Sequence, residues 1–158
     1  MCGQEMNMNN SIGEVLALFI SEKGHGERIQ KSEIFLDEKG VIGDKFYAKD
    51  IERSVLLTSK ESYSLALEHH ISMEYGTLGE NILIDYNPYH LLAGRRLTIG
   101  TATIEITQNC TICNHLSTVD KKLPKLLKDD RGIFVKVVGE GIIKKGDKVF
   151  LLKAPYIL

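Results

Sequence analysis

The sequence predicts a mainly β protein, a barrel or a sandwich, built as one domain. Roughly eight short segments are rich in aliphatic and β-branched residues, turn signals separate them closely, and only two segments have a helical pattern. No Pro- or Ser-rich linker, low-complexity block or internal repeat divides the chain. We therefore expect a flexible, polar N-terminal tail over residues 1–12 and a single domain over residues 13–158.

The expected strands are apolar runs bounded by glycines or polar turns. Residues 13–20 read Gly-Glu-Val-Leu-Ala-Leu-Phe-Ile, which is typical of a mostly buried strand. Residues 21–30 read as a polar loop, and residues 139–146 read as the turn region of a hairpin. The remaining strands are expected, in chain order, at 33–36, 54–57, the end of 76–84, 97–99, 101–107, 132–138 and 148–152.

Two segments predict helices. Thr58-Ser59-Lys60-Glu61 fits a capping box, in which the Thr58 hydroxyl accepts a hydrogen bond from a free backbone N–H and Glu61 reaches back. Apolar or aromatic residues at positions 63, 65, 66 and 67 extend this helix to about residue 69 or 70. Residues 120–128 predict a short helix with Pro124 in its first turns.

Composition excludes several classes of function. The chain has 158 residues, 43% of them hydrophobic, and a net charge of −1, so it has no basic field to gather nucleic acid. Its longest apolar runs are too short to cross a bilayer, and its first residues lack the pattern of a signal peptide. We expect a cytoplasmic protein with neither nucleic acid nor membrane as a partner. The sequence leaves the oligomeric state open.

The strongest candidate for chemistry is a pair of cysteines after an expected strand. The chain has three cysteines, Cys2, Cys110 and Cys113, and an odd number without export signals argues against a disulfide framework. The last two lie in the polar run Asn-Cys-Thr-Ile-Cys-Asn-His, which ends at His115, a base that could favour the thiolate. A thiolate is a nucleophile and a ligand for soft metals, so we predict Cys113, with Cys110, as the catalytic group.

The two cysteines also allow other interpretations. Both could be small core hydrophobes, although a polar loop held by a scaffold more often carries function. A structural zinc site needs four ligands, and the chain offers only one Cys pair with a nearby histidine. A thioredoxin-like motif belongs next to a βαβ unit, which this region lacks.

Three glycine turns place a polar side chain directly after a glycine. They contain Gly43-Asp44, Gly79-Glu80-Asn81 and Gly146-Asp147. Such a pattern more often reflects the residues that a tight turn requires than a binding site. A backbone rich in turns can nevertheless bind anions through its N–H groups. Arg53 opens an expected strand and could project into a cleft.

The order of these segments resembles the MOSC domain, the module named after the C-terminal part of molybdenum cofactor sulfurases. The likeness covers about residues 13–152. It is carried by the succession Gly-Val-Ile-Gly-Asp (40–44), Arg-Ser-Val-Leu-Leu (53–57), Gly-Thr-Leu-Gly-Glu-Asn-Ile (76–82), the strand pair at 97–107, Cys113, Gly-Ile-Phe-Val-Lys-Val (132–137) and Ile-Lys-Lys-Gly-Asp (143–147).

The resemblance implies a closed, mostly antiparallel β-barrel with a few short helices and a pocket that holds one key cysteine. Cys113 matches that cysteine, which in the family carries sulfur or ligates the molybdenum of the molybdenum cofactor (molybdopterin). Family members often have a proline where this chain has Ile112, and Cys110 is an additional thiol. The residues implied to bind the cofactor are Arg53, Gly79, Glu80, Asn81, Asp44 and His115.

These observations support three hypotheses. The chain could bind the cofactor or transfer sulfur through Cys113, or it could use the same site to reduce N-hydroxylated bases. The desulfurase domain of full sulfurases is not found in this sequence, so a partner protein would supply sulfur or electrons. The alternative is a non-catalytic binding or regulatory domain with redox-sensitive cysteines.

Overall fold

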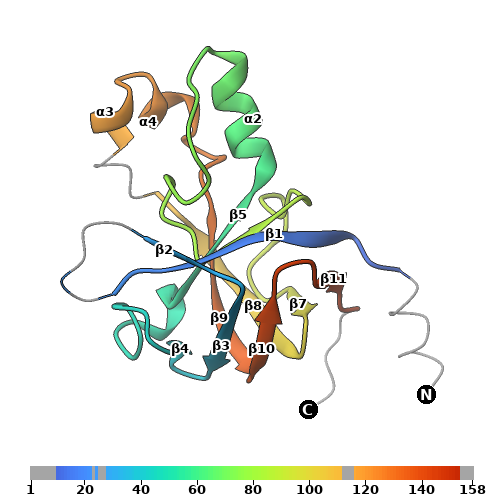
Figure 1. Ribbon diagram of the computed structural model, residues 1–158. Coiled ribbons are helices and arrows are strands. Elements are labelled where there is room, and N and C mark those ends of the chain that lie inside the picture. The colour runs from blue at the N-terminus through green and yellow to red at the C-terminus, as the bar shows by residue number, and fades with distance from the viewer. Residues whose placement is uncertain (1–9, 23, 25–27, 112–115, 154–158) are drawn as a thin grey trace.

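The computed structural model describes residues 10–22, 24, 28–111 and 116–153. Figure 1 shows the strands crossing in a barrel, with α2, α3 and α4 gathered at one end. The strands are β1 Gly13–Ile20, β2 Ile29–Lys31, β3 Glu33–Asp37, β4 Gly40–Val41, β5 Val55–Ser59, β6 Ile82–Ile84, β7 Arg96–Ile99, β8 Ala102–Asn109, β9 Ile133–Gly139, β10 Gly141–Lys144 and β11 Lys148–Leu151. The helices are η1 Ile51–Arg53 (a 3₁₀ turn), α2 Lys60–Glu68, α3 Leu116–Val119 and α4 Leu123–Leu126.

The predicted closed β-barrel is confirmed. Strands pair in the order β11-β7-β8-β9-β5-β6-β1, and a further pairing of β11 with β1 closes the ring. The pairs are antiparallel except β5 with β6, whose parallel register sets Leu57 opposite Ile82 and whose connection contains α2. Such a crossover is what a parallel pair requires. A smaller sheet, β10-β3-β4, packs against the barrel.

Two apolar clusters account for the long hydrophobic run in β1. Leu18 points into the barrel core, whereas Ala17 and Phe19 point outward and pack under the helices with Tyr63 and Leu83. Because both faces of β1 are covered, the strand is apolar almost throughout rather than alternating. In β8, by contrast, only alternate residues such as Ile104 and Ile106 are buried.

Several element predictions need correction. The cap of α2 is Ser59, the last residue of β5, whose Oγ accepts a hydrogen bond from the Glu61 N–H at 3.1 Å. The Thr58 hydroxyl instead donates to the Arg131 carbonyl at 3.2 Å. Residues 139–146, expected to be a turn region, contain β10, which pairs with β3. Strand β2 and helix α3 were also missed, since each is too short to show a period. No helix among the described residues is long and apolar enough to cross a membrane.

Candidate functional site

A cavity of about 870 Å³ opens beside the outer face of β1, and its walls come from distant parts of the chain. They include the turn segment before β5, the glycine turn before β6 and the ends of β8 and β9. Such a volume is typical of a site for a small organic ligand or cofactor. Its aromatic wall is formed by Phe19, Phe46, Tyr75 and Phe134.

The cavity is strongly cationic. Among its described lining residues, the acidic side chains are Asp50 and Glu74, whereas the cationic ones are Arg28, Lys45, Lys49, Arg53 and Arg131. A concave wall with an excess of charge of one sign concentrates the electric field inside it. The cavity therefore favours an anionic ligand, even though the whole chain has a net charge of only −1.

Two guanidinium groups meet over Gly79. Arg28 Nη1 donates to the carbonyl oxygen of Glu80 at 3.3 Å, and Arg131 Nη2 donates to the carbonyl oxygen of Leu78 at 3.0 Å. A Cβ at position 79 would lie 3.6 Å from Arg131 Nη2 and 3.7 Å from Arg28 Nη2. These are ordinary van der Waals distances, so it is the backbone of Gly79, with φ +88°, that favours glycine here.

The pKa of Arg28 is affected by its burial and by the charged groups around it. Burial lowers the pKa of Arg28, the charge of Arg131 lowers it further, and Asp44 and Glu80 oppose the shift. An arginine nevertheless stays charged in a protein. Two adjacent, largely buried cations repel each other, and an anion bound between them would relieve that repulsion.

Arg53 reaches the cavity from η1. It is the last residue of this turn rather than the first of a strand, and its guanidinium carbon lies 5.5 Å from the centroid of the Phe134 ring. This separation is within the range of cation–π contacts. The hypothesis that Arg53 projects into a cleft agrees with its position in the cavity wall.

Asn81, in the cavity wall, and Asp44, behind it, form a buried polar hub. The Asn81 side chain accepts from the Leu56 N–H at 3.1 Å and donates to the Phe19 carbonyl at 3.2 Å and to Asp44 Oδ1 at 3.3 Å. Asp44 also accepts from the Ser21 N–H at 2.7 Å. The hub therefore joins β1, β5 and the turn that follows β4, and it holds the cavity wall in shape.

Glu80 points away from the cavity and is fully buried. Its Oε2 accepts from the Tyr63 hydroxyl at 2.6 Å and from the Gly76 N–H at 3.1 Å, and burial raises its pKa above the ordinary value of 4.5. The Tyr63 hydroxyl also accepts from the Gly76 and Leu78 N–H groups at 3.0 and 3.3 Å. Glu80 and Tyr63 thus hold the glycine turn from beneath, and neither is presented to a ligand.

The raised pKa of Glu80 predicts a pH-dependent stability. Between pH 4.5 and its folded-state pKa, Glu80 binds more protons in the folded than in the unfolded chain, so its contribution to stability falls as pH rises. We therefore compare the free energy of unfolding of the wild type with that of Glu80→Gln. The difference, wild type minus variant, should decrease as pH rises above 4.5. Urea unfolding at several pH values measures it, and a difference independent of pH would refute the assignment.

The cysteine prediction is only half inside the described structure. Cys110 lines the cavity just after β8, is free and 3% exposed, and donates its backbone N–H to the Gly132 carbonyl at 3.0 Å. Cys113 and His115 lie outside the described residues, as does Cys2. Among the residues that are described, no group of three His, Cys, Asp or Glu side chains could hold a metal ion.

Sequence reasoning brought together part of this site. Arg53, Gly79, Asn81 and Cys110 do line one cavity, whereas Asp44 and Glu80 are buried behind it. It missed Arg28 and Arg131. The only local signal for Arg131 is a charged residue next to Gly132 at the start of a strand, and Arg28 lies in what reads as a polar loop.

Comparisons with known proteins place this chain in a family and identify solved structures of similar fold. The model of the MOSC domain family matches residues 23–150. Among solved structures, the YuaD protein of Bacillus subtilis has a TM-score of 0.73 at 16% identity, over 88% of this chain and 94% of that one. YiiM of Escherichia coli has a TM-score of 0.67 at 18% identity, over 92% and 72%. At such identities these structures support the fold alone. A comparison with curated protein sequences gives no match.

Proposed function

Because the chain belongs to the MOSC domain family, we propose that its cavity binds the molybdenum cofactor, with Cys113 as the protein thiolate that ligates molybdenum or carries sulfur. The observation that carries the proposal is the cationic cavity with a cysteine, Cys110, in its wall. Its size, charge and thiol chemistry together match a pterin that bears a phosphate and a soft metal.

The residues present fit the chemical parts of this group. Arginine offers a rigid fork of N–H donors that suits phosphate, and Arg28, Arg53 and Arg131 all line the cavity. Aromatic rings such as those of Phe19 and Tyr75 give a planar heterocycle apolar surface to pack against. A cysteine thiolate is the protein ligand that soft metals prefer.

The roles of the chain's own residues follow from this assignment. The arginines would bind and orient the anionic end, and the glycine turn 76–79 would let it approach the backbone closely. The thiolate of Cys113 would hold the metal or a sulfane sulfur, with Cys110 beside it as a second thiol. The bound cofactor would supply redox or sulfur chemistry, for which a partner protein in the cytoplasm would deliver electrons or sulfur. N-hydroxylated bases are the substrates we propose for a reductive role.

Metal and pterin analysis tests this proposal. The full chain, purified from molybdenum-replete cells, should contain molybdenum and pterin, and Cys113→Ser should lose most of the molybdenum. Cys2→Ser is the matched control and should retain it. Loss in Cys110→Ser alone would transfer the ligand role to Cys110. Wild-type molybdenum content in both the Cys110→Ser and the Cys113→Ser proteins would contradict a thiolate ligand.

One observation favours the alternative, a binding or regulatory domain without turnover. Cys110 is only 3% exposed, and a buried cysteine is usually inert. Thiol alkylation separates the two functions. A working thiolate reacts below the ordinary thiol pKa of about 8.5, whereas slow reaction of every cysteine at neutral pH would favour the alternative.

A further inference from the structure

Thr107 occupies an unusual place in the barrel. The register between β8 and β9 shifts at this point: Ile106 is opposite Val135 and Gln108 is opposite Phe134, so Thr107 is an extra residue. Such a β-bulge re-aims the side chain of the extra residue, and bulges are frequent beside active sites. Here the bulge directs a hydroxyl group toward η1.

The Thr107 hydroxyl contacts two carbonyl oxygens. Its Oγ1 lies 2.5 Å from the carbonyl oxygen of Glu52 and 3.1 Å from that of Phe134, and its single proton is shared between these two acceptors. Glu52 immediately precedes Arg53, and Phe134 carries the ring beneath the Arg53 guanidinium. This hydroxyl therefore links the backbone at Glu52, next to Arg53, with the backbone at Phe134, whose ring contacts the Arg53 guanidinium. The distance between these two backbone positions sets the direction of the Arg53 side chain.

The turn η1 depends on such external contacts. It has only three residues, and an isolated turn of this length does not hold its own conformation. Asp50 caps it by accepting from the Glu52 N–H at 3.1 Å, and the Ser54 hydroxyl donates to the Ile51 carbonyl at 2.9 Å. The Asp50 bond lies within the turn, whereas the Ser54 hydroxyl also reaches the Val135 carbonyl of β9, at a long 3.5 Å.

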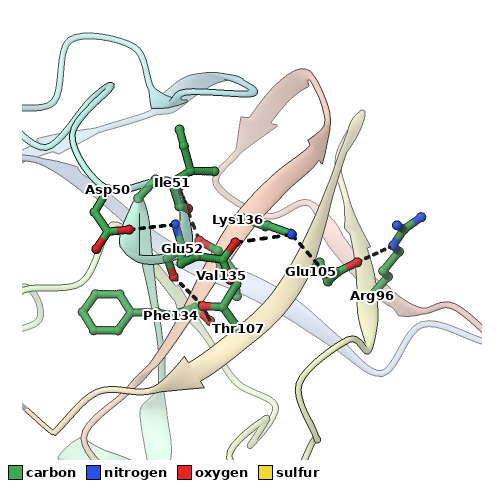
Figure 2. A network of polar contacts seen from close by, with 10 residues as sticks. Asp50, Ile51, Glu52, Arg96, Glu105, Thr107, Phe134, Val135 and Lys136 are labelled. Atoms are coloured by element: carbon green, nitrogen blue, oxygen red, sulfur yellow. Dashed lines mark hydrogen bonds and ion pairs between the residues drawn. The ribbon is translucent and has the colours of Figure 1, made fainter.

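A surface network also touches η1. In this network Glu52 pairs with Lys136, Lys136 with Glu105, and Glu105 with Arg96 (Figure 2). The nitrogen–oxygen distances of these pairs are 3.3, 3.6 and 2.9 Å. The Glu52 side chain is 55% exposed, and exposed ion pairs contribute little to stability. The Thr107 hydroxyl, by contrast, bonds to backbone atoms, of η1 at Glu52 and of β9 at Phe134, and so links the turn to the barrel directly.

We propose that Thr107 is a positioning residue, which fixes η1 on β9 and so directs the Arg53 guanidinium at the anionic ligand of the cavity. The ligand part of this inference rests on the proposed function. The positional part does not, because it concerns only the contact between Arg53 and Phe134.

The test compares Thr107→Val, which removes the hydroxyl, with Thr107→Ser, which keeps it. The NMR resonance of the Arg53 Nε–H group, shifted by the Phe134 ring, should move toward its solvent-exposed value in Thr107→Val and stay in place in Thr107→Ser. Inorganic phosphate should bind Thr107→Val roughly three- to tenfold more weakly than the wild type, the loss expected for one hydrogen bond. In an Arg53→Met background, Thr107→Val should have no further effect on phosphate affinity.

The outcomes separate the two proposals. Absence of phosphate binding by the wild type would count against the proposed function, while the Arg53 resonance still tests Thr107. An unmoved resonance in Thr107→Val, or an equal loss of phosphate affinity with and without Arg53, would overturn the positioning role. If Thr107→Val does not fold, Thr107→Ala removes the same hydroxyl without setting a methyl group against two carbonyl oxygens, and the same results apply to it.

Discussion

Replacing Arg28 and Arg131 together with methionine is expected to weaken phosphate binding in the cavity by roughly a hundredfold or more. A hydrogen bond to a charged group contributes about 1.5–3 kcal/mol, and each 1.4 kcal/mol is about tenfold in affinity, so two such contacts give at least this loss. Both guanidinium groups are anchored beside Gly79 by the carbonyls that flank it, so the two act at one point.

Titration calorimetry with inorganic phosphate measures this effect. Methionine keeps most of the length and apolar surface of arginine, so circular dichroism should show an intact fold. Lys148→Met is the matched control. It also removes one positive charge, but from an exposed pair with Glu14 at 2.9 Å on the barrel surface. Equal phosphate affinity in the wild type and the double variant would show that these arginines do not face the ligand.

Replacing Asn81 with leucine is expected to destabilise the fold by about 3–5 kcal/mol, because it breaks a buried hydrogen-bonded network. The change leaves the Leu56 N–H and the Phe19 carbonyl without their side-chain partner and removes a donor from Asp44. Each buried polar group that loses its partner costs about 1–3 kcal/mol, and Asn81 is only 4% exposed, so water cannot replace the amide.

Urea unfolding gives the free energy directly. Asn87→Leu is a suitable control, since Asn87 also makes two hydrogen bonds, to Glu61 Oε2 at 2.7 Å and from the Tyr89 N–H at 3.0 Å, but at a more exposed position. We expect its loss to be about 1 kcal/mol or less, because water replaces the exposed bonds. A similarly small loss in Asn81→Leu would mean that the hub does not hold the wall.

Local pattern was sufficient to predict much of the barrel. Residues 13–20 were predicted with the bounds that β1 has, because a strand covered on both faces is apolar along its whole length. Strand β10 was missed because residues 141–144 contain both glycine and lysine and form a strand only by pairing with β3. The parallel pairing of β5 with β6 depends on the α2 crossover, which no local pattern specifies.

The site was less accessible from sequence because it is assembled by long-range contacts. Arg131 reaches a carbonyl 53 residues away and Arg28 one 52 residues away, so neither shows a motif. The Gly-Glu-Asn turn was singled out from its sequence, but the direction of its side chains depends on packing. Gly79 faces the cavity, whereas Glu80 turns inward to Tyr63.

The central claim is that the cavity beside β1 holds molybdenum. Anomalous X-ray diffraction across the molybdenum absorption edge, on crystals of the full chain purified from molybdenum-replete cells, tests it most directly. We predict one anomalous peak inside the volume enclosed by Arg53, Gly79 and Arg131, and its absence in Cys113→Ser. A peak elsewhere on the molecule, or pterin and molybdenum present in the sample with no peak in the cavity, would contradict it.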